Sequence, residues 1–324
     1  MIDLASNFNR LGAPVDLIGH LANTLANTAS TYAGDSMGMV DMTFAAEYFN
    51  VTPESIAITD GSTEAFSLVL KKYAGQPVYV YQPTFWEYAF FAKEAGSKIV
   101  YIPAGDDVKE TLQGSAPGVV VLCNPNNPTG HMLSKDTILS LAQDNPNHTF
   151  VVDETYLWFA GDYRSLSSSR LVEQEPNIIV VTSLSKICTI PGLRVGLIFA
   201  SDGSMKEKVP YSVLPIQIEA LRYALSSCED FFQASHQGAA RDRAAIVKYL
   251  DSRQEYEYLE PHANFVFIKA TKPGLAEYML AQSIRVRGGK EFGEKYKNYI
   301  RIRLSEENSD EWNTVITALN SFVN

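Results

Sequence analysis

The chain has 324 residues and a formal net charge of −10 at pH 7, and 46% of its residues are hydrophobic. This composition is typical of a globular protein that buries one large core and a smaller second one. The acidic balance, without a cluster of Lys and Arg residues, argues against nucleic acid as a partner.

The sequence predicts neither a membrane segment nor a metal site. The start of the chain, MIDLASNFNRLG, lacks the basic stretch and apolar run of a signal peptide, and no apolar run is long enough to span a bilayer. We therefore expect a cytoplasmic protein. Its three cysteines lie far apart and its five histidines are scattered, which favours neither a disulfide nor metal ligation.

Short β-branched runs, each ending in turn-forming residues, recur through the first two thirds of the chain. They lie at residues 56–61, 78–83, 119–125, 149–154, 178–185 and 194–200. Helical patterns lie between them, at residues 62–73, 86–95 and 134–143. Continuous apolar runs fit strands that are buried on both faces. We therefore predict an α/β domain with a largely parallel sheet, which binds its ligand beyond the carboxyl ends of the strands.

After about residue 225 the pattern changes. A long polar helix is expected around residues 230–252, followed by strand-like runs at 264–270, 284–287 and 299–305. This order indicates a smaller α+β domain. We divide the chain into an N-terminal arm (residues 1–25) that packs with the small domain, a large domain (residues 26–225) and a small domain (residues 226–324).

The first candidate site is the run TDGSTE at residues 59–64, which follows a predicted strand and opens a predicted helix. Gly61, Ser62 and Thr63 would present backbone N–H groups and hydroxyls at the positive end of that helix, which suits an anion. A glycine turn with a capped helix has the same sequence, so this motif alone leaves both interpretations open.

Two further runs place polar side chains after buried strands. In CNPNNPTG, at residues 123–130, two prolines and a glycine fix the direction of Asn127. In FVVDETY, at residues 150–156, Asp153 ends a buried strand and Tyr156 follows it. A buried acid needs a partner, and a protonated ring nitrogen, a helix N-terminus or a salt bridge would each serve.

The most specific signal is TSLSKICTIPGLRVG at residues 182–196, which groups two serines, Lys186 and Arg194 in a turn shaped by Gly and Pro. With this segment the chain resembles the fold-type I pyridoxal-phosphate enzymes, in particular the class I/II aminotransferases around histidinol-phosphate aminotransferase and threonine-phosphate decarboxylase. The resemblance covers nearly the whole chain and runs in order through SNFNRLGAP, TDGSTE, PTFWEY, NPNNPTG, VVDETY, SLSK with GLRVG, ANFVF, IRVR and YIRIRLS.

The resemblance implies pyridoxal 5′-phosphate as the cofactor and assigns a role to each motif. Lys186 would form the imine with the cofactor aldehyde, and Asp153 would pair with the pyridine nitrogen. Asn127 and Tyr156 would hydrogen-bond the phenolic oxygen. Lys186, Asp153 and Tyr156 are thus the expected catalytic residues. The residues expected around the phosphate or against the ring are Gly61, Ser62, Thr63, Phe85, Ser183, Ser185 and Arg194.

The resemblance also implies how the substrate and a second subunit contribute. Arg301 would grip the substrate carboxylate, while Arg287 would face a distal anion or is a solvated charge on a strand. Tyr32 matches a tyrosine that relatives donate to the phosphate of the neighbouring subunit, so a homodimer is expected. Arg10 stands where relatives commonly have a proline, in a segment that closes over the substrate, and this departure leaves the substrate open.

The expected reaction transfers an amino group between an amino acid, or an amino-alcohol phosphate such as histidinol phosphate, and a 2-oxo acid. The alternative keeps the cofactor and changes the reaction to decarboxylation of the threonine-phosphate decarboxylase type. A ligand-sensing regulator is disfavoured because we expect no DNA-binding domain ahead of Ser6. A nicotinamide-dependent dehydrogenase is disfavoured because no GxGxxG follows a strand.

Overall fold

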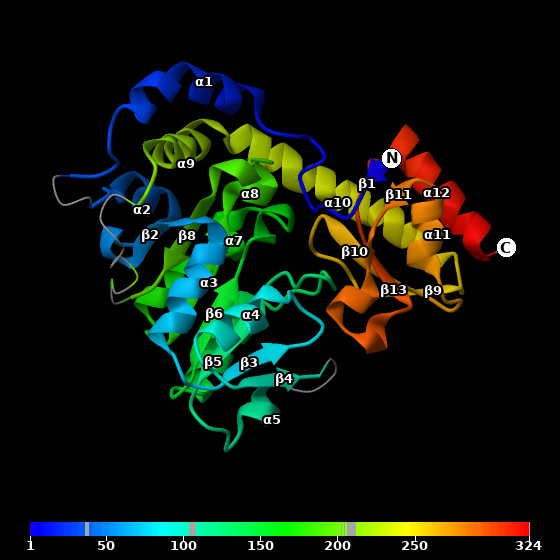
Figure 1. The fold of residues 1–324 in the computed structure, drawn as a ribbon, viewed down its shortest axis with the longest axis horizontal. Helices are drawn as coiled ribbons and strands as arrows, with labels where there is room; N and C mark the ends of the chain where they lie inside the picture. Colours follow the sequence, from blue (N-terminus) through cyan, green and yellow to red (C-terminus); the bar gives the residue numbers. More distant parts are fainter. Residues whose placement is uncertain (36–38, 104–107, 202, 204, 206–211, 324) are drawn as a thin grey trace.

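The structure is a computed structural model of the chain, and it describes residues 1–35, 39–103, 108–201, 203, 205 and 212–323 (Figure 1). Within these residues the strands form a seven-stranded, a four-stranded and a two-stranded sheet. No helix in the described part of the chain is both long and apolar enough to cross a membrane.

The seven-stranded sheet has the strand order β2-β8-β7-β6-β5-β3-β4. Its strands are β2 (Ile56–Asp60), β3 (Val78–Tyr81), β4 (Ile99–Ile102), β5 (Val119–Cys123), β6 (Thr149–Asp153), β7 (Ile178–Ser183) and β8 (Val195–Phe199). Strand β8 is antiparallel to β2 and β7, and the other neighbours are parallel. The prediction of an α/β fold with a largely parallel sheet is therefore confirmed.

Both faces of this sheet are buried, which explains the continuous apolar runs. Along β5, Val120 and Leu122 belong to one buried apolar cluster, while Val119 and Val121 belong to another. The alternation follows from the two-residue repeat of a strand. Strand β4 escaped prediction because it lies at the edge of the sheet, where Tyr101 is exposed and the run is short.

The helices of this region cover the two faces of the sheet (Figure 1). They are α2 (Thr43–Phe49), α3 (Gly61–Lys72), α4 (Glu87–Glu94), α5 (Val108–Leu112), α6 (Lys135–Asp144), α7 (Tyr163–Leu166), α8 (Leu184–Ile187) and α9 (Pro215–Ser227). The segments predicted as helices at 62–73, 86–95 and 134–143 correspond to α3, α4 and α6. Ser134 begins α6 by accepting a hydrogen bond from the Thr137 N–H.

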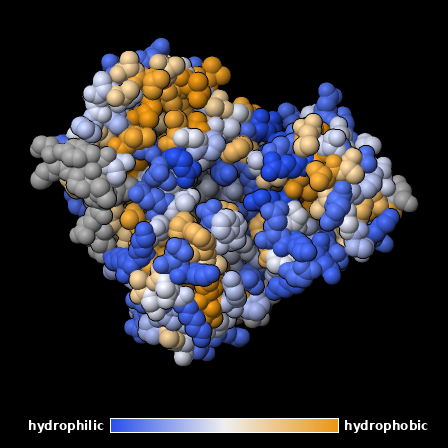
Figure 2. Space-filling view, viewed as in Figure 1, coloured by the Kyte–Doolittle hydropathy of each residue, from blue (hydrophilic) through white to orange (hydrophobic). Residues whose placement is uncertain are grey.

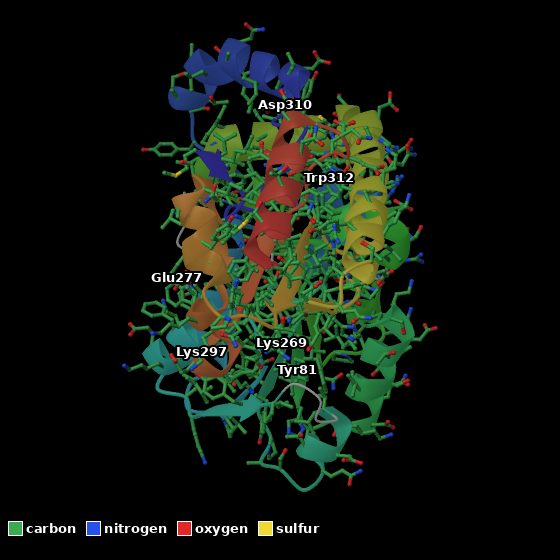
Figure 3. All side chains as sticks on the ribbon, turned by 90° about the vertical axis from the view of Figure 1, so that its right-hand side faces the viewer. Tyr81, Lys269, Glu277, Lys297, Asp310 and Trp312 are labelled. Carbon is green, nitrogen blue, oxygen red and sulfur yellow. The ribbon has the colours of Figure 1, made fainter. Side chains whose placement is uncertain are left out.

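The C-terminal region is built on an antiparallel sheet with the order β12-β13-β10-β9 and has its own buried core. Its elements are α10 (Glu229–Asp251), β9 (Tyr256–Tyr258), β10 (Phe265–Ala270), α11 (Leu275–Ala281), β12 (Arg287–Gly288), β13 (Tyr299–Arg303) and α12 (Asp310–Val323). Helix α10 extends from the large sheet toward this region (Figure 1). Figure 3 shows α12, which carries Asp310 and Trp312, beside α10.

The N-terminal residues contact both regions. Strand β1 (Ile2–Asp3) pairs in parallel with β11 (Ile284–Arg285), whereas α1 (Val15–Ala29) packs on α9 (Figure 1). The run predicted as one strand at 284–287 is thus two short strands, β11 and β12, in different sheets. The division of the chain at residues 25 and 225 remains a prediction.

Candidate active site

A cavity of about 320 Å³ lies at the carboxyl ends of β5, β6 and β7, and residues of the C-terminal strands β11, β12 and β13 close its other side. Figure 2 shows hydrophilic residues gathered where the large sheet region faces the C-terminal region. Most of the predicted site residues line this cavity: Ser62, Thr63, Phe85, Asn127, Asp153, Tyr156, Ser183, Ser185, Lys186, Arg194, Arg287 and Arg301.

Lys186 lies on the short helix α8, directly after β7. The helix begins at Ser183, whose hydroxyl accepts a hydrogen bond from the Ser185 N–H at 3.1 Å. Burial, together with the guanidinium charges of Arg301 and Arg194, lowers the pKa of Lys186 to about 8. A larger fraction of the amine is therefore neutral near physiological pH than for an exposed lysine, and a neutral amine is the nucleophilic form.

Asp153 ends β6 and is buried. The Tyr88 hydroxyl donates a hydrogen bond to its Oδ2 at 2.6 Å, and the Thr155 N–H donates one to its Oδ1 at 3.0 Å. Burial raises the pKa of Asp153, and these hydrogen bonds only partly oppose the change. Both donors are neutral, so the site would be stabilised by a cationic ligand atom beside this carboxylate.

The first turn of α3 and Arg194 form an anion-binding corner. Arg194 Nη2 lies 3.3 Å from the Asp60 carbonyl oxygen and 3.4 Å from Thr63 Oγ1. Gly61 does not line the cavity, but its lack of a side chain makes this arrangement possible. A Cβ built on Gly61, whose φ is 71°, would lie 2.4 Å from Arg194 Nη2. Helix N–H groups, hydroxyls and a guanidinium together suit a phosphate.

The two arginines assigned to substrate binding are neighbours across β12 and β13, where Arg287 is paired with Arg301. Arg301 is buried, and its Nη1 donates a hydrogen bond to Asn127 Oδ1 at 2.6 Å. Its Nη2 also donates to the Ala5 carbonyl, and burial lowers the pKa of Arg301 to about 10. Arg287 is half-exposed and forms an ion pair with Glu291 at 2.9 Å.

Two aromatic side chains complete the predicted set. Tyr156 is buried, and Asn7 Nδ2 donates to its hydroxyl at 3.4 Å. Burial raises the pKa of Tyr156 to about 12, so the phenol is neutral and can donate a hydrogen bond. Phe85 lies at the cavity wall, 5.8 Å from the ring of Tyr88 in an edge-to-face contact.

Tyr32 does not reach this cavity within one chain. Its side chain is 79% exposed and lies at a separate open pocket between α1 and α9. The role expected for it requires a second subunit, so it remains a prediction.

The lining residues that were not singled out from the sequence include Asn7, Glu87, Tyr88 and Arg285. Tyr88 had a detectable signal, because it follows Phe85 by three residues in a helical pattern and therefore shares its face. Burial raises the pKa of Glu87, and the charge of Arg194 opposes this change. Arg285 forms an ion pair with Asp3 at 3.5 Å, which no local pattern indicated.

These features fit the cofactor that the resemblance implies. The corner at Arg194 suits its phosphate, the buried carboxylate of Asp153 suits its ring nitrogen, and the amine of Lys186 suits its aldehyde.

Known proteins resemble this chain over nearly its whole length. The family model for aminotransferases of class I and II matches residues 1–319. Histidinol-phosphate aminotransferase 1 of Mannheimia succiniciproducens is 29% identical over 336 residues, which cover 99% of this chain and 90% of that protein.

Solved structures show the same fold. L-threonine-O-3-phosphate decarboxylase from Porphyromonas gingivalis matches with a TM-score of 0.86 and 25% identity, covering 100% of this chain and 99% of the other. Histidinol-phosphate aminotransferase from Sinorhizobium meliloti, solved in complex with pyridoxal-5′-phosphate, matches with a TM-score of 0.84 and 21% identity, covering 99% of this chain and 90% of the other.

Proposed function

The chain belongs to the aminotransferases of class I and II and uses pyridoxal phosphate. From this premise we propose that its amino donor carries an anionic group. The donor we propose is an amino-alcohol phosphate such as histidinol phosphate, and the acceptor is a 2-oxo acid. The charge of the cavity carries this proposal. Five cationic side chains line it, namely Lys186, Arg194, Arg285, Arg287 and Arg301, against the acids Glu87 and Asp153.

We propose that the cofactor is held at five points. Lys186 attaches its aldehyde covalently, and the corner formed by Arg194, Ser62 and Thr63 binds its phosphate. Asp153 pairs with the ring nitrogen, while Tyr156 and Asn127 donate hydrogen bonds to the phenolic oxygen. Phe85 covers one face of the ring.

When bound, pyridoxal phosphate supplies an electron sink for the pair left when a bond at the substrate α-carbon breaks. Asp153 keeps a negative charge beside the ring nitrogen, and the hydrogen bond from Tyr88 fixes its direction. Lys186 would move a proton at its Nζ, which would accept the α-proton of the substrate and later release it. Its lowered pKa suits both steps, because the amine can be neutral before the transfer and charged after it.

Arg301 is the proposed anchor for the anion of the donor, which is the phosphate in histidinol phosphate and the carboxylate in an amino acid. Its Nε is buried and has no hydrogen-bond partner among the described residues, so it has a donor left for a substrate oxygen. Arg287 and Arg285, on β12 and β11, are more exposed than Arg301 and each forms an ion pair, with Glu291 and Asp3 respectively. We propose that they add to the attraction of an anionic donor.

Paired donors test this proposal. Histidinol phosphate and histidinol differ only in the phosphate, and glutamate formed from 2-oxoglutarate measures transfer from each. We expect Arg287→Ala to weaken the phosphate-bearing donor selectively and Arg301→Ala to weaken every anionic donor, by roughly 2 to 5 kcal/mol if the pair is desolvated. Equal use of both donors by the wild type would contradict the proposal, as would equal losses on both for Arg287→Ala.

Decarboxylation of a phosphorylated amino acid is the second candidate, and the match to L-threonine-O-3-phosphate decarboxylase over both full chains favours it. The same cations would hold a carboxylate and a phosphate together. Release of carbon dioxide from threonine phosphate without a 2-oxo acid would identify this reaction, and formation of glutamate would identify transfer.

We also propose that the enzyme is a cytoplasmic homodimer. Val15 and Leu25 of α1 and the nearby Leu214 are exposed apolar side chains, and Figure 2 shows an apolar patch over α1 and α9. Tyr32 lies beside this patch, where a second subunit would approach. Sedimentation equilibrium tests the assembly, and a mass of one chain at micromolar concentration would contradict it.

A further inference from the structure

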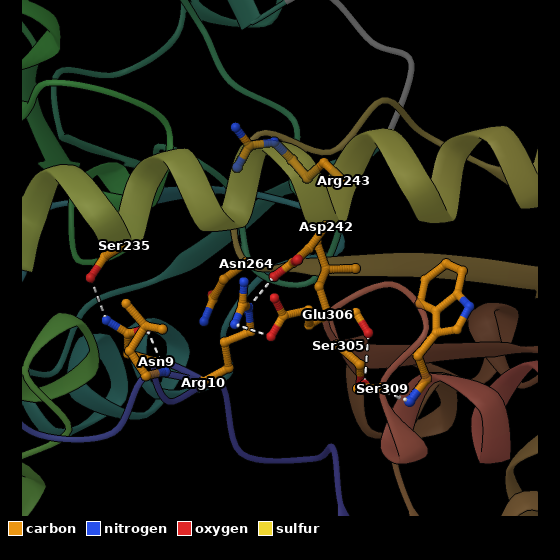
Figure 4. Close-up of polar contacts among 12 residues, drawn as sticks. Asn9, Arg10, Ser235, Asp242, Arg243, Asn264, Ser305, Glu306 and Ser309 are labelled. Carbon is orange, nitrogen blue, oxygen red and sulfur yellow. Dashed lines mark hydrogen bonds and ion pairs between the residues drawn. The ribbon is translucent and has the colours of Figure 1, made fainter.

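Residues 5–12, which we name the strap, run between α8 and the C-terminal region. The Asn9 N–H donates a hydrogen bond to the Lys186 carbonyl at 3.1 Å, and Asn9 Nδ2 donates to the Ile187 carbonyl at 2.9 Å. Asn9 Nδ2 also donates to Ser235 Oγ of α10 at 2.7 Å (Figure 4). The buried residue Asn9 thus binds the carbonyls of two consecutive residues in α8, the helix that carries Lys186.

The strap also covers the side chain of Lys186. The ring of Phe8 lies 4.6 Å from Lys186 Nζ. Asn7, the preceding residue, is buried and contacts the Tyr156 hydroxyl. The backbone of this stretch is tied to the C-terminal region, because Asn264 Nδ2 donates to the carbonyls of Asn7 and Phe8.

Arg10 anchors the far end of the strap. Its Nε lies 2.6 Å from Asp242 Oδ2 on α10, and its Nη1 lies 3.0 Å from Glu306 Oε2 (Figure 4). Asp242 is only 3% exposed, so this pair is largely shielded from water. Gly238 leaves room for the guanidinium, since a Cβ there would lie 3.3 Å from Arg10 Nη2.

The two anchors of Arg10 belong to the elements that position the site. Helix α10 also carries Ser235, the partner of Asn9, and Glu306 follows β13, which carries Arg301. We propose that Arg10 is a positioning residue for Lys186, because it fixes the strap to α10 and to the segment after β13 and so excludes water from the lysine side chain. This inference rests on the proposed function, in which Lys186 holds the cofactor.

In this proposal Arg10 affects Lys186 through the position of the strap and not through its own charge. Burial is the largest cause of the lowered pKa of Lys186. The charged groups with the largest effect on the pKa of Lys186 are Arg301, Arg194, Arg287 and Glu87. Arg10 is not one of them. Loss of its side chain therefore acts by loosening the strap, and water that reaches Lys186 favours the protonated nitrogen.

The test compares Arg10→Met with Arg303→Met in the holoenzyme. Arg303 is a matched control, because its Nη2 lies 2.9 and 2.8 Å from the two carboxylate oxygens of Glu311 and its side chain is similarly shielded, away from Lys186. Both variants should lower the melting temperature. Only Arg10→Met should accelerate hydrogen exchange at the Asn9 amide, by about tenfold or more.

The second readout is the pH midpoint of the near-visible absorption of the bound cofactor. We expect Arg10→Met to move it upward by roughly half a pH unit or more, and Arg303→Met to leave it unchanged. Arg10→Lys should restore part of the wild-type behaviour, and Asp242→Asn, which removes only the partner's charge, should shift the midpoint in the same direction as Arg10→Met.

The outcomes separate this inference from the proposed function. If the wild type shows no near-visible band with pyridoxal phosphate, the proposed role of Lys186 fails. If the band is present and Arg10→Met matches Arg303→Met in both exchange and midpoint, Arg10 has only a structural role and the inference is overturned. If Arg10→Met does not fold, hydrogen exchange at the Asn9 amide and the pH midpoint are compared for Asp242→Asn instead.

Discussion

Among single residues, Asp153 is the one whose surroundings most require a partner of opposite charge. It is buried, and its two hydrogen-bond donors, the Tyr88 hydroxyl and the Thr155 N–H, are neutral. A cofactor that brings a protonated ring nitrogen to this carboxylate would supply the missing charge. The carboxylate would in turn keep that nitrogen protonated, which would make the ring a good electron sink.

We expect Asp153→Asn to retain cofactor binding and to slow the first half-reaction about a hundredfold or more, roughly 3 kcal/mol in the barrier. Tyr88→Phe, which keeps the charge and removes one neutral hydrogen bond, should cost about tenfold or less. Stopped-flow absorbance with a single amino donor measures both rates. An effect of Asp153→Asn below tenfold would assign that residue to the structure alone.

Glu154, the next residue, is fully buried and performs no step of the proposed reaction. It accepts hydrogen bonds from Tyr163 Oη at 2.8 Å, Ser167 Oγ at 2.5 Å and the Ser168 N–H at 2.7 Å. Burial raises the pKa of Glu154 to about 7 from its ordinary 4.5. The folded protein therefore holds a proton here that the unfolded chain releases above about pH 4.5.

This difference in protonation sets the direction in which the free energy of unfolding changes with pH. The free energy of unfolding should fall by up to about 3 kcal/mol from this group as the pH rises from about 4.5 to 7, and change little from it above that range. Glu154→Gln resembles the protonated form and should lose this part of the pH dependence. Urea unfolding of both proteins at pH 5 and pH 8 measures the difference, and equal changes in both would contradict it.

At the scale of elements, the first turn of α3 shows how the main chain shapes the phosphate corner. Gly61 and Gly75 both have positive φ values, 71° and 79°. An added Cβ meets nothing within 4 Å at Gly75, whereas at Gly61 it would collide with the Arg194 guanidinium. Substitution of either glycine therefore strains the backbone, but only substitution of Gly61 disturbs Arg194.

We expect Gly61→Ala to raise the dissociation constant for pyridoxal phosphate about tenfold or more, because Arg194 must move away from the corner. Gly75→Ala is the matched control and should lower stability by about 1 kcal/mol without changing that constant. Equilibrium titration of the cofactor-free proteins gives both constants. Equal constants for the two variants would show that the corner does not hold the phosphate.

Much of the large sheet could be predicted from the sequence, because burial on both faces makes β2, β3, β5, β6, β7 and β8 continuous apolar runs. Three of its helices were also predicted. Helix α1 was missed, because it begins after Pro14 without a side-chain cap and leaves Val15 and Ile18 exposed. The run at 284–287 was predicted as one strand, since sequence periodicity does not show that its halves pair with β1 and β13.

The candidate site was predictable where local motifs carry it and not where distant segments meet. Lys186 and Asp153 each follow an apolar strand within a distinctive run, so their positions could be proposed from sequence. The contact of Asn9 with Lys186 joins residues 177 positions apart, and that of Arg10 with Glu306 joins residues 296 apart. No periodicity or turn signal reports such contacts.

In the whole molecule, the sheet region and the C-terminal region meet at one cavity. The sheet region supplies Lys186, Asp153 and Arg194, and the C-terminal strands supply Arg287 and Arg301. Amino transfer requires the covalent cofactor from the first set and anion recognition from the second. Lys186 is the proposed site of covalent attachment, so the proposed function depends most directly on this residue.

The most direct test of this claim is the absorption spectrum of the purified full-length protein after reconstitution with pyridoxal phosphate. We predict a near-visible band for the wild type, and attachment of the cofactor to residue 186 that survives borohydride treatment and is located by peptide mass spectrometry. Lys186→Ala should show neither the band nor the attachment. A wild type without the band, or a cofactor reduced onto a different lysine, would contradict the account.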